Sequence, residues 1–176
     1  MPGLESGSGW VHSEFSHDDQ HVVATHRGGL VSVSDVSGDN PKHKGTYQHS
    51  GEAFYAHFSP SDRRVVSVGA EATGIIWDPL TGAVLAPPLG HDSKLRIGTV
   101  AFGPTDSQLL TLSFDNSIRI WDGSTGGRVT ASVRQPRGVM TGKWDAAGER
   151  VVTSSFDGNA RLWDARTGES VGVWLR

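Results

Sequence analysis

Apolar and polar residues follow one pattern that recurs four times along the chain. Four segments of 21 residues align without gaps, each beginning at an aromatic residue and ending at an aspartate: 15–35, 58–78, 102–122 and 144–164. Their starting points are 43, 44 and 42 residues apart. Self-similarity at a fixed period of this length predicts a repeat architecture in which each repeat is one supersecondary unit.

The pattern inside each segment predicts β-strands. A turn cluster is followed by a β-branched or aliphatic run, such as Val65-Val66, and then by a second turn and an alternating strand, such as 118–121. A further turn follows the closing aspartate, and in three repeats it contains a Thr-Gly pair. Because no window shows strong helical periodicity, we predict an all-β chain.

Paired residues at fixed positions identify the repeat type. The repeats end in Trp77-Asp78, Trp121-Asp122 and Trp163-Asp164, and Gly90-His91 stands eleven residues before Phe102. Over residues 10–176 the chain resembles the WD-repeat β-propeller family, although the first repeat has Ser34-Asp35 in place of Trp-Asp. The resemblance implies a β-propeller with four four-stranded antiparallel blades, at about 10–50, 51–93, 94–135 and 136–176, after a flexible N-terminal tail at 1–9.

The resemblance also implies a hydrogen-bonded tetrad in each blade, made of a histidine, a hydroxyl residue, an acid and the tryptophan. By position, the third repeat has all four members, which are His91, Ser113, Asp115 and Trp121. The fourth has Ser155, Asp157 and Trp163 without a histidine, and the second has Trp77, with Glu71 at the acid position and Gly69 at the hydroxyl position. The first repeat has none, so we expect its blade to depend most on a neighbour.

Composition and motifs argue against catalysis, metal binding and cofactor binding. A Ser-His-Asp set could serve a hydrolase, but here it matches a structural tetrad and nothing supplies an oxyanion hole, so we predict no catalytic residues. Seven of the eight histidines lie within 12–57 without zinc-motif spacing, so we expect surface and turn histidines and no metal. No glycine-rich phosphate loop is present, and we expect no cofactor.

Charge and hydropathy bear on partners and location. The net charge of −3 gives no reason to expect nucleic acid or an anionic membrane as a partner. No signal peptide and no apolar stretch of about 20 residues is visible. The chain has no cysteine, which excludes disulfides without fixing the compartment. We expect a cytoplasmic protein.

The strand pattern leaves the ring open. The first strand is expected at about 10–15 and the last at about 170–175, so no strand is left over for exchange between the termini. WD-type blades resemble those of rings of about six to eight blades, so four would make half a ring with two exposed faces. We predict a homodimer that closes an eight-bladed ring. Closure of the four blades on themselves, or a fragment of a longer propeller, are the alternatives.

By analogy with the family, two positions in each blade reach the face on which propellers bind ligands. Five of these eight positions hold large side chains, and the candidate binding face consists of Phe54, Phe114, Met140, Phe156 and Arg27. Clustered aromatics with an arginine suit protein or peptide recognition, although Phe114 and Phe156 could instead only pack on neighbouring blades. We therefore predict a non-catalytic scaffold or sensor module. An enzyme that uses the ring channel would need converging acids, bases or metal ligands.

Overall fold

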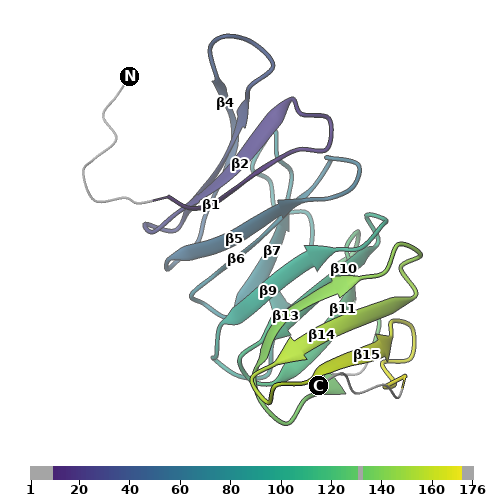
Figure 1. Cartoon of the computed structure of the whole chain (residues 1–176). Helices are drawn as coiled ribbons and strands as arrows, with labels where there is room; N and C mark the ends of the chain where they lie inside the picture. Colours follow the sequence, from purple (N-terminus) through teal and green to yellow (C-terminus); the bar gives the residue numbers. More distant parts are fainter. Residues whose placement is uncertain (1–9, 131–132, 172–176) are drawn as a thin grey trace.

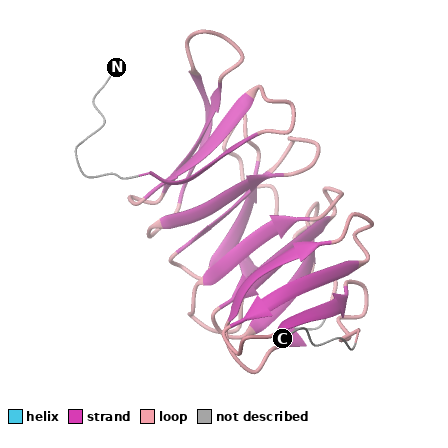
Figure 2. Cartoon of the chain, viewed as in Figure 1, coloured by secondary structure: helices cyan, strands magenta, loops and turns pink. Residues whose placement is uncertain are grey.

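The computed structural model describes residues 10–130 and 133–171. The expected tail at 1–9 and most of the expected last strand lie outside the described residues. In the described part the chain forms strands, turns and loops (Figure 2). No helix in that part is long and apolar enough to cross a membrane.

The strands form four antiparallel sheets, each from one repeat, which confirms the predicted fold class. The first holds β1 (Trp10–Phe15), β2 (His21–His26), β3 (Leu30–Asp35) and β4 (Lys42–Gln48). The second holds β5 (Ala53–Phe58), β6 (Val65–Gly69), β7 (Thr73–Trp77) and β8 (Leu89–Gly90). The third holds β9 (Ile97–Phe102), β10 (Gln108–Ser113), β11 (Ser117–Asp122) and β12 (Val133–Arg134). The fourth holds β13 (Val139–Trp144), β14 (Arg150–Ser155) and β15 (Ala160–Asp164), and a bridge between Trp163 and Ser170 continues it.

The four sheets stack in a row as blades (Figure 1). The innermost strands β1, β5, β9 and β13 lie side by side in that order, and the first and last blades stand at opposite ends of the row. Each pair of neighbouring innermost strands is in contact. The chain is thus an arc of blades whose inner strands share one concave side.

The hydrophobic core lies between blades. One cluster joins Val23, Val31 and Val33 of the first blade to Phe58, Trp77 and their neighbours in the second. Two further clusters join the second blade to the third and the third to the fourth, around Trp121 and Trp163 respectively. Each tryptophan therefore faces the preceding blade, and apolar burial between blades stabilises the arc.

Turns at the outer ends of the inner strands also connect the blades. Asp62 adopts a left-handed conformation with φ of 58° in the turn after β5. Its carboxylate accepts the backbone N–H groups of His17 at 2.9 Å and Asp18 at 3.0 Å in the preceding blade. Asp106 does the same for the N–H of Ser61, at 3.0 Å. An aspartate at this position therefore caps the turn of the blade before it.

Candidate functional site

The tetrad of the third blade is a continuous chain of hydrogen bonds. Trp121 Nε1 donates to Thr111 Oγ1 at 2.8 Å, and Thr111 Oγ1 lies 2.8 Å from His91 Nε2. His91 Nδ1 lies 2.7 Å from the hydroxyl of Ser117, which donates to Asp115. One set of protons satisfies every link, with the Thr111 hydroxyl donating to Nε2 and His91 Nδ1–H donating to Ser117. This buried chain of hydrogen bonds rigidifies the blade.

The assignment of Ser113 to this tetrad is wrong, and Thr111 holds its place. Ser113 lies two residues further along the same face of β10, beyond Leu112, the last residue of β10 that pairs with β11. Its hydroxyl instead donates to the backbone carbonyls of Leu95 and Arg96, at 3.4 and 3.3 Å. In the fourth blade Ser155 likewise donates to the carbonyl of Arg137 at 2.9 Å, while Trp163 uses Thr153 at 2.8 Å. Both serines therefore hydrogen-bond to loop carbonyls, and the threonines accept the hydrogen bonds from the tryptophan indoles.

The second blade has a complete tetrad that the sequence analysis missed. Trp77 Nε1 donates to the hydroxyl of Ser67 at 3.0 Å, and that hydroxyl lies 2.8 Å from His49 Nε2. His49 Nδ1 then contacts Glu71 directly. Glu71 stands at the position of Asp115 but is one methylene longer, so it reaches the imidazole without a serine between them. Ser67 supplies the hydroxyl group that we expected this blade to lack, because Gly69 stands at the predicted hydroxyl position.

The fourth blade replaces the histidine by a glutamine and an arginine. Gln135 donates to the Thr153 hydroxyl through Nε2 and accepts from Arg161 Nη1 at 2.8 Å through Oε1. Arg161 Nη2 donates to Asp157 at 2.6 Å. A continuous chain of five residues still joins Trp163 to Asp157, with glutamine and arginine in place of the histidine.

Burial sets the protonation of the third tetrad. Desolvation, followed by the positive charge of Arg119, lowers the pKa of His91 from 6.5 to about 4. Burial opposes ionisation of Asp115, but hydrogen bonds from Ser117 lower the pKa of that carboxyl below its ordinary value. A neutral imidazole between two hydroxyls and an ionised carboxylate match the proton arrangement above. The group is held as a structural unit, without a free base or nucleophile.

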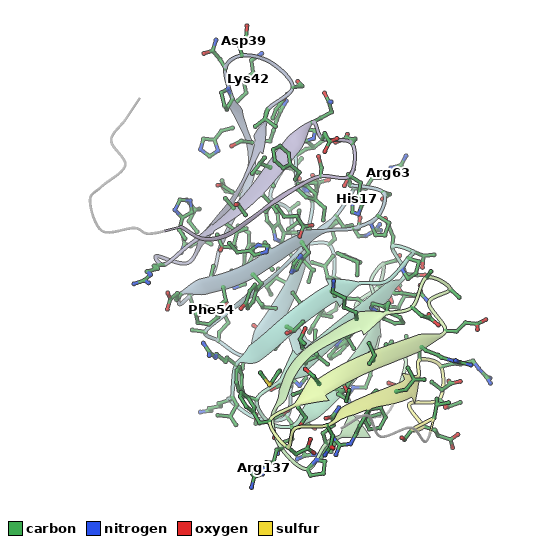
Figure 3. All side chains as sticks on the ribbon, viewed as in Figure 1. His17, Asp39, Lys42, Phe54, Arg63 and Arg137 are labelled. Carbon is green, nitrogen blue, oxygen red and sulfur yellow. The ribbon has the colours of Figure 1, made fainter. Side chains whose placement is uncertain are left out.

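Four of the five residues predicted for the binding face lie together in one groove. Phe54, Phe114, Met140 and Phe156 line a cavity of about 200 Å³, together with Arg96. Phe54 comes from β5 and Met140 from β13, whereas Phe114 and Phe156 occupy the turns after β10 and β14. Phe54 and the loop residue Arg137 lie on the same border of the molecule, across from His17 and Arg63 (Figure 3).

The groove has a cation held between two rings. The guanidinium of Arg96 lies 5.1 Å from the ring centroid of Phe54 and 4.7 Å from that of Phe114. The Phe114 ring is in turn 6.4 Å from that of Phe156. Such cation–π contacts contribute about 0.5–1 kcal/mol each at exposed sites. They fix the position of the arginine while its edge remains exposed.

Backbone contacts place the two phenylalanines that directly follow Ser113 and Ser155. The N–H of Phe114 donates to the carbonyl of Arg96 at 3.2 Å, and the N–H of Phe156 donates to that of Gly138 at 3.0 Å. Gly98 leaves the space that the Phe114 ring fills, because a Cβ there would lie 2.8 Å from the ring. The turns and the loops before the inner strands therefore form one rigid rim.

The sequence pattern, the stacked sheets and the tetrads agree with one family. The model described as "WD domain, G-beta repeat" matches residues 84–122 and 128–164. The chain therefore contains WD repeats at these two positions.

The chain is similar to parts of longer proteins. THO complex subunit 6 of Arabidopsis thaliana is 29% identical over 123 residues, which cover 67% of this chain and 32% of that one. Nuclear distribution protein PAC1 of Arthroderma benhamiae is 27% identical over 154 residues, covering 74% and 33%. The crystal structure of the computationally designed Ika8 protein has a TM-score of 0.79 at 22% identity, covering 93% of this chain and 48% of that one. The chain spans about a third of the length of these two relatives.

Within this WD-repeat chain, Arg27 stands apart from the other predicted face residues. Its side chain is 71% exposed, and its Nε lies 3.8 Å from Oε1 of Glu52. Arg27 belongs to the first blade and Glu52 to the second. It does not line the groove. Arg96 supplies the groove's cation instead, and its one signal in the sequence is its place directly before an inner strand.

Proposed function

We propose that this WD-repeat protein is a non-catalytic scaffold that binds an extended segment of a partner protein in the Arg96 groove. The observation that carries the proposal is the clamp of Phe54, Arg96 and Phe114 beside Phe156, which is 55% exposed. Large apolar side chains on a surface, gathered around a fixed arginine, are typical of binding hot spots.

The groove chemistry defines the segment. Phe114, Met140 and Phe156 offer apolar contact, and the exposed edge of the Arg96 guanidinium can donate paired hydrogen bonds to a carboxylate. We therefore expect a peptide with a large apolar side chain next to an aspartate or glutamate. Of the described residues, those that line the groove carry no carboxylate or imidazole, which argues for binding over catalysis.

Peptide selection tests this function. A library of random peptides displayed on phage is selected on the purified protein, and the enriched peptides are measured by fluorescence polarisation. We expect an apolar residue beside an acid among them, and at least about tenfold weaker binding to the variant carrying Phe114→Ser and Phe156→Ser.

The matched control for this variant is Leu80→Ser. Leu80 is 56% exposed, as Phe156 is at 55%, but it lines a different pocket with Asp62 and Arg63. Peptides that bind the double variant and the wild-type chain equally would refute the groove assignment. Thermal unfolding of all three proteins shows whether loss of binding reflects loss of fold.

We further propose that two chains close a ring, with the fourth blade of each packing on the first blade of the other. Val152 supports this closure, since it is 40% exposed while Val66 and Leu110, at the same position in the second and third blades, are fully buried. Those two residues face the next blade in the arc. Val152 therefore lies on a face of the kind that another blade covers.

Asp19 supports the same closure from the other end. It has the φ of 58° that Asp62 has, and it occupies the equivalent turn of the first blade. Its side chain is exposed, as is Ala147 in the corresponding turn of the fourth blade. In a closed ring, Asp19 would cap that turn in the partner chain. Further blades of a longer chain could cover the same faces, and the solution mass distinguishes the two arrangements.

A further inference from the structure

Three potential metal ligands converge on the concave side of the arc. His12 and Glu14 alternate along β1 and so share one face of it, and His57 extends from β5 beside them. One ligand atom from each lies within 4.8 Å of the others. His57 Nδ1 lies 2.5 Å from Glu14 Oε2, and the two imidazole centroids are 4.9 Å apart. We call these three residues the His12–Glu14–His57 cluster.

The ion pair between Glu14 and His57 does not account for the whole cluster. His12 Nδ1 is buried and has no hydrogen-bond partner among the described residues. An unpaired buried polar atom is costly, so a native structure that retains one calls for an unseen partner. Two imidazoles this close also repel each other when both are protonated, and a bound cation in place of the protons removes that repulsion.

The distances require only small side-chain movements. Ligand atoms around a tetrahedral zinc ion with bonds of about 2.1 Å lie roughly 3.4 Å apart. His57 and Glu14 would separate by roughly 1 Å from their present 2.5 Å, and the widest pair would close by a similar amount. Beside the cluster, a cavity of about 320 Å³ runs along β5, β9 and β13, which gives an ion access and leaves room for water ligands.

We propose that the His12–Glu14–His57 cluster binds one first-row divalent metal ion, with Zn²⁺ as the probe. Two nitrogen donors and one carboxylate suit zinc and its neighbours, whereas Ca²⁺ and Mg²⁺ prefer oxygen ligands only. All three ligands belong to one chain, so the site depends neither on peptide binding nor on ring closure. The metal would join β1 to β5 and so strengthen the first blade, which has neither the hydroxyl nor the tryptophan of a tetrad.

Calorimetric titration of ZnCl₂ into the untagged protein at pH 7.5 tests the site. We expect one Zn²⁺ per chain with a Kd in the micromolar range or below, a higher thermal midpoint with Zn²⁺, and no binding of Ca²⁺. Glu14→Gln preserves the shape of the side chain and removes its charge, and we expect at least about tenfold weaker binding. The double variant His12→Ala with His57→Ala should lose the site.

His43→Ala is the matched control, because His43 is an exposed histidine on β4, at the opposite edge of the first sheet from β1. It should bind Zn²⁺ as the wild-type chain does. Two results would overturn the proposal: no Zn²⁺ binding below the millimolar range, or equal binding by Glu14→Gln and the wild-type chain. Because Glu14→Gln retains the packing of the pair, its folding can be confirmed by circular dichroism before the titration.

Discussion

Phe15 and Phe58 occupy the same position in consecutive blades, yet Phe58 is 3% exposed and Phe15 is 60% exposed. Phe58 is buried because the first blade packs on it, within the cluster that also contains Val23 and Trp77. No described blade precedes Phe15. The difference between the two phenylalanines is therefore the difference between an internal blade interface and an uncovered one.

Replacement of Phe15 by lysine tests whether this face is covered in solution. In the proposed dimer, a lysine would place a charge between blades of two chains, so we expect Phe15→Lys to shift the protein from dimer to monomer in sedimentation velocity. Leu80→Lys is the control, since Leu80 is 56% exposed but lies on the loop after β7, near the junction of the first two blades. A Phe15→Lys protein that remains dimeric would place the interface elsewhere.

The corrected tetrad predicts different costs for two neighbouring hydroxyl residues. Thr111→Val leaves the buried Trp121 Nε1 without an acceptor and His91 Nε2 without its hydroxyl partner. We expect the free energy of unfolding in urea to fall by about 1–3 kcal/mol. Ser113→Ala removes longer bonds, to the carbonyls of Leu95 and Arg96 and from the backbone N–H of Asp115 at 3.2 Å, and we expect a smaller loss. A larger loss for Ser113→Ala would contradict the assignment of Thr111.

His91 makes stability depend on pH in a defined window. Its pKa is lowered from 6.5 to about 4 by burial and then by the charge of Arg119, so the unfolded chain binds a proton that the folded chain does not. The contribution of neutral His91 to the free energy of unfolding is complete above pH 6.5 and is lost as pH falls toward 4, by at most about 1.4 kcal/mol per pH unit. Urea unfolding at several pH values measures this slope.

His91→Gln should flatten that slope. Gln135 occupies the histidine place in the fourth blade and is hydrogen-bonded to Arg161, and Arg119 stands at the equivalent position in the third blade. Glutamine therefore has a precedent in this chain and does not titrate. An unchanged pH dependence in the variant would mean that other groups, among them His12, cause the loss at low pH.

Repeat spacing was sufficient to predict the blades, because each is built from local turns and strands whose pattern recurs. Hydroxyl assignment failed for a physical reason: Thr111 and Ser113 lie on one face of β10, and only the pairing of Leu109 with Trp121 shows which of them faces the indole. His49 escaped notice because it follows Gln48 and stands nine residues before Phe58, whereas His91 follows a glycine and stands eleven residues before Phe102. The His12–Glu14–His57 cluster was hidden because spacing within one segment says nothing about ligands on strands of neighbouring blades.

The mass of the unmodified chain in solution tests the central claim, that four blades form half of a ring closed by a second copy. Static light scattering after gel filtration, at micromolar concentration, should give about twice the chain mass of 18.8 kDa. A single species of 18.8 kDa that remains monodisperse and folded would contradict it.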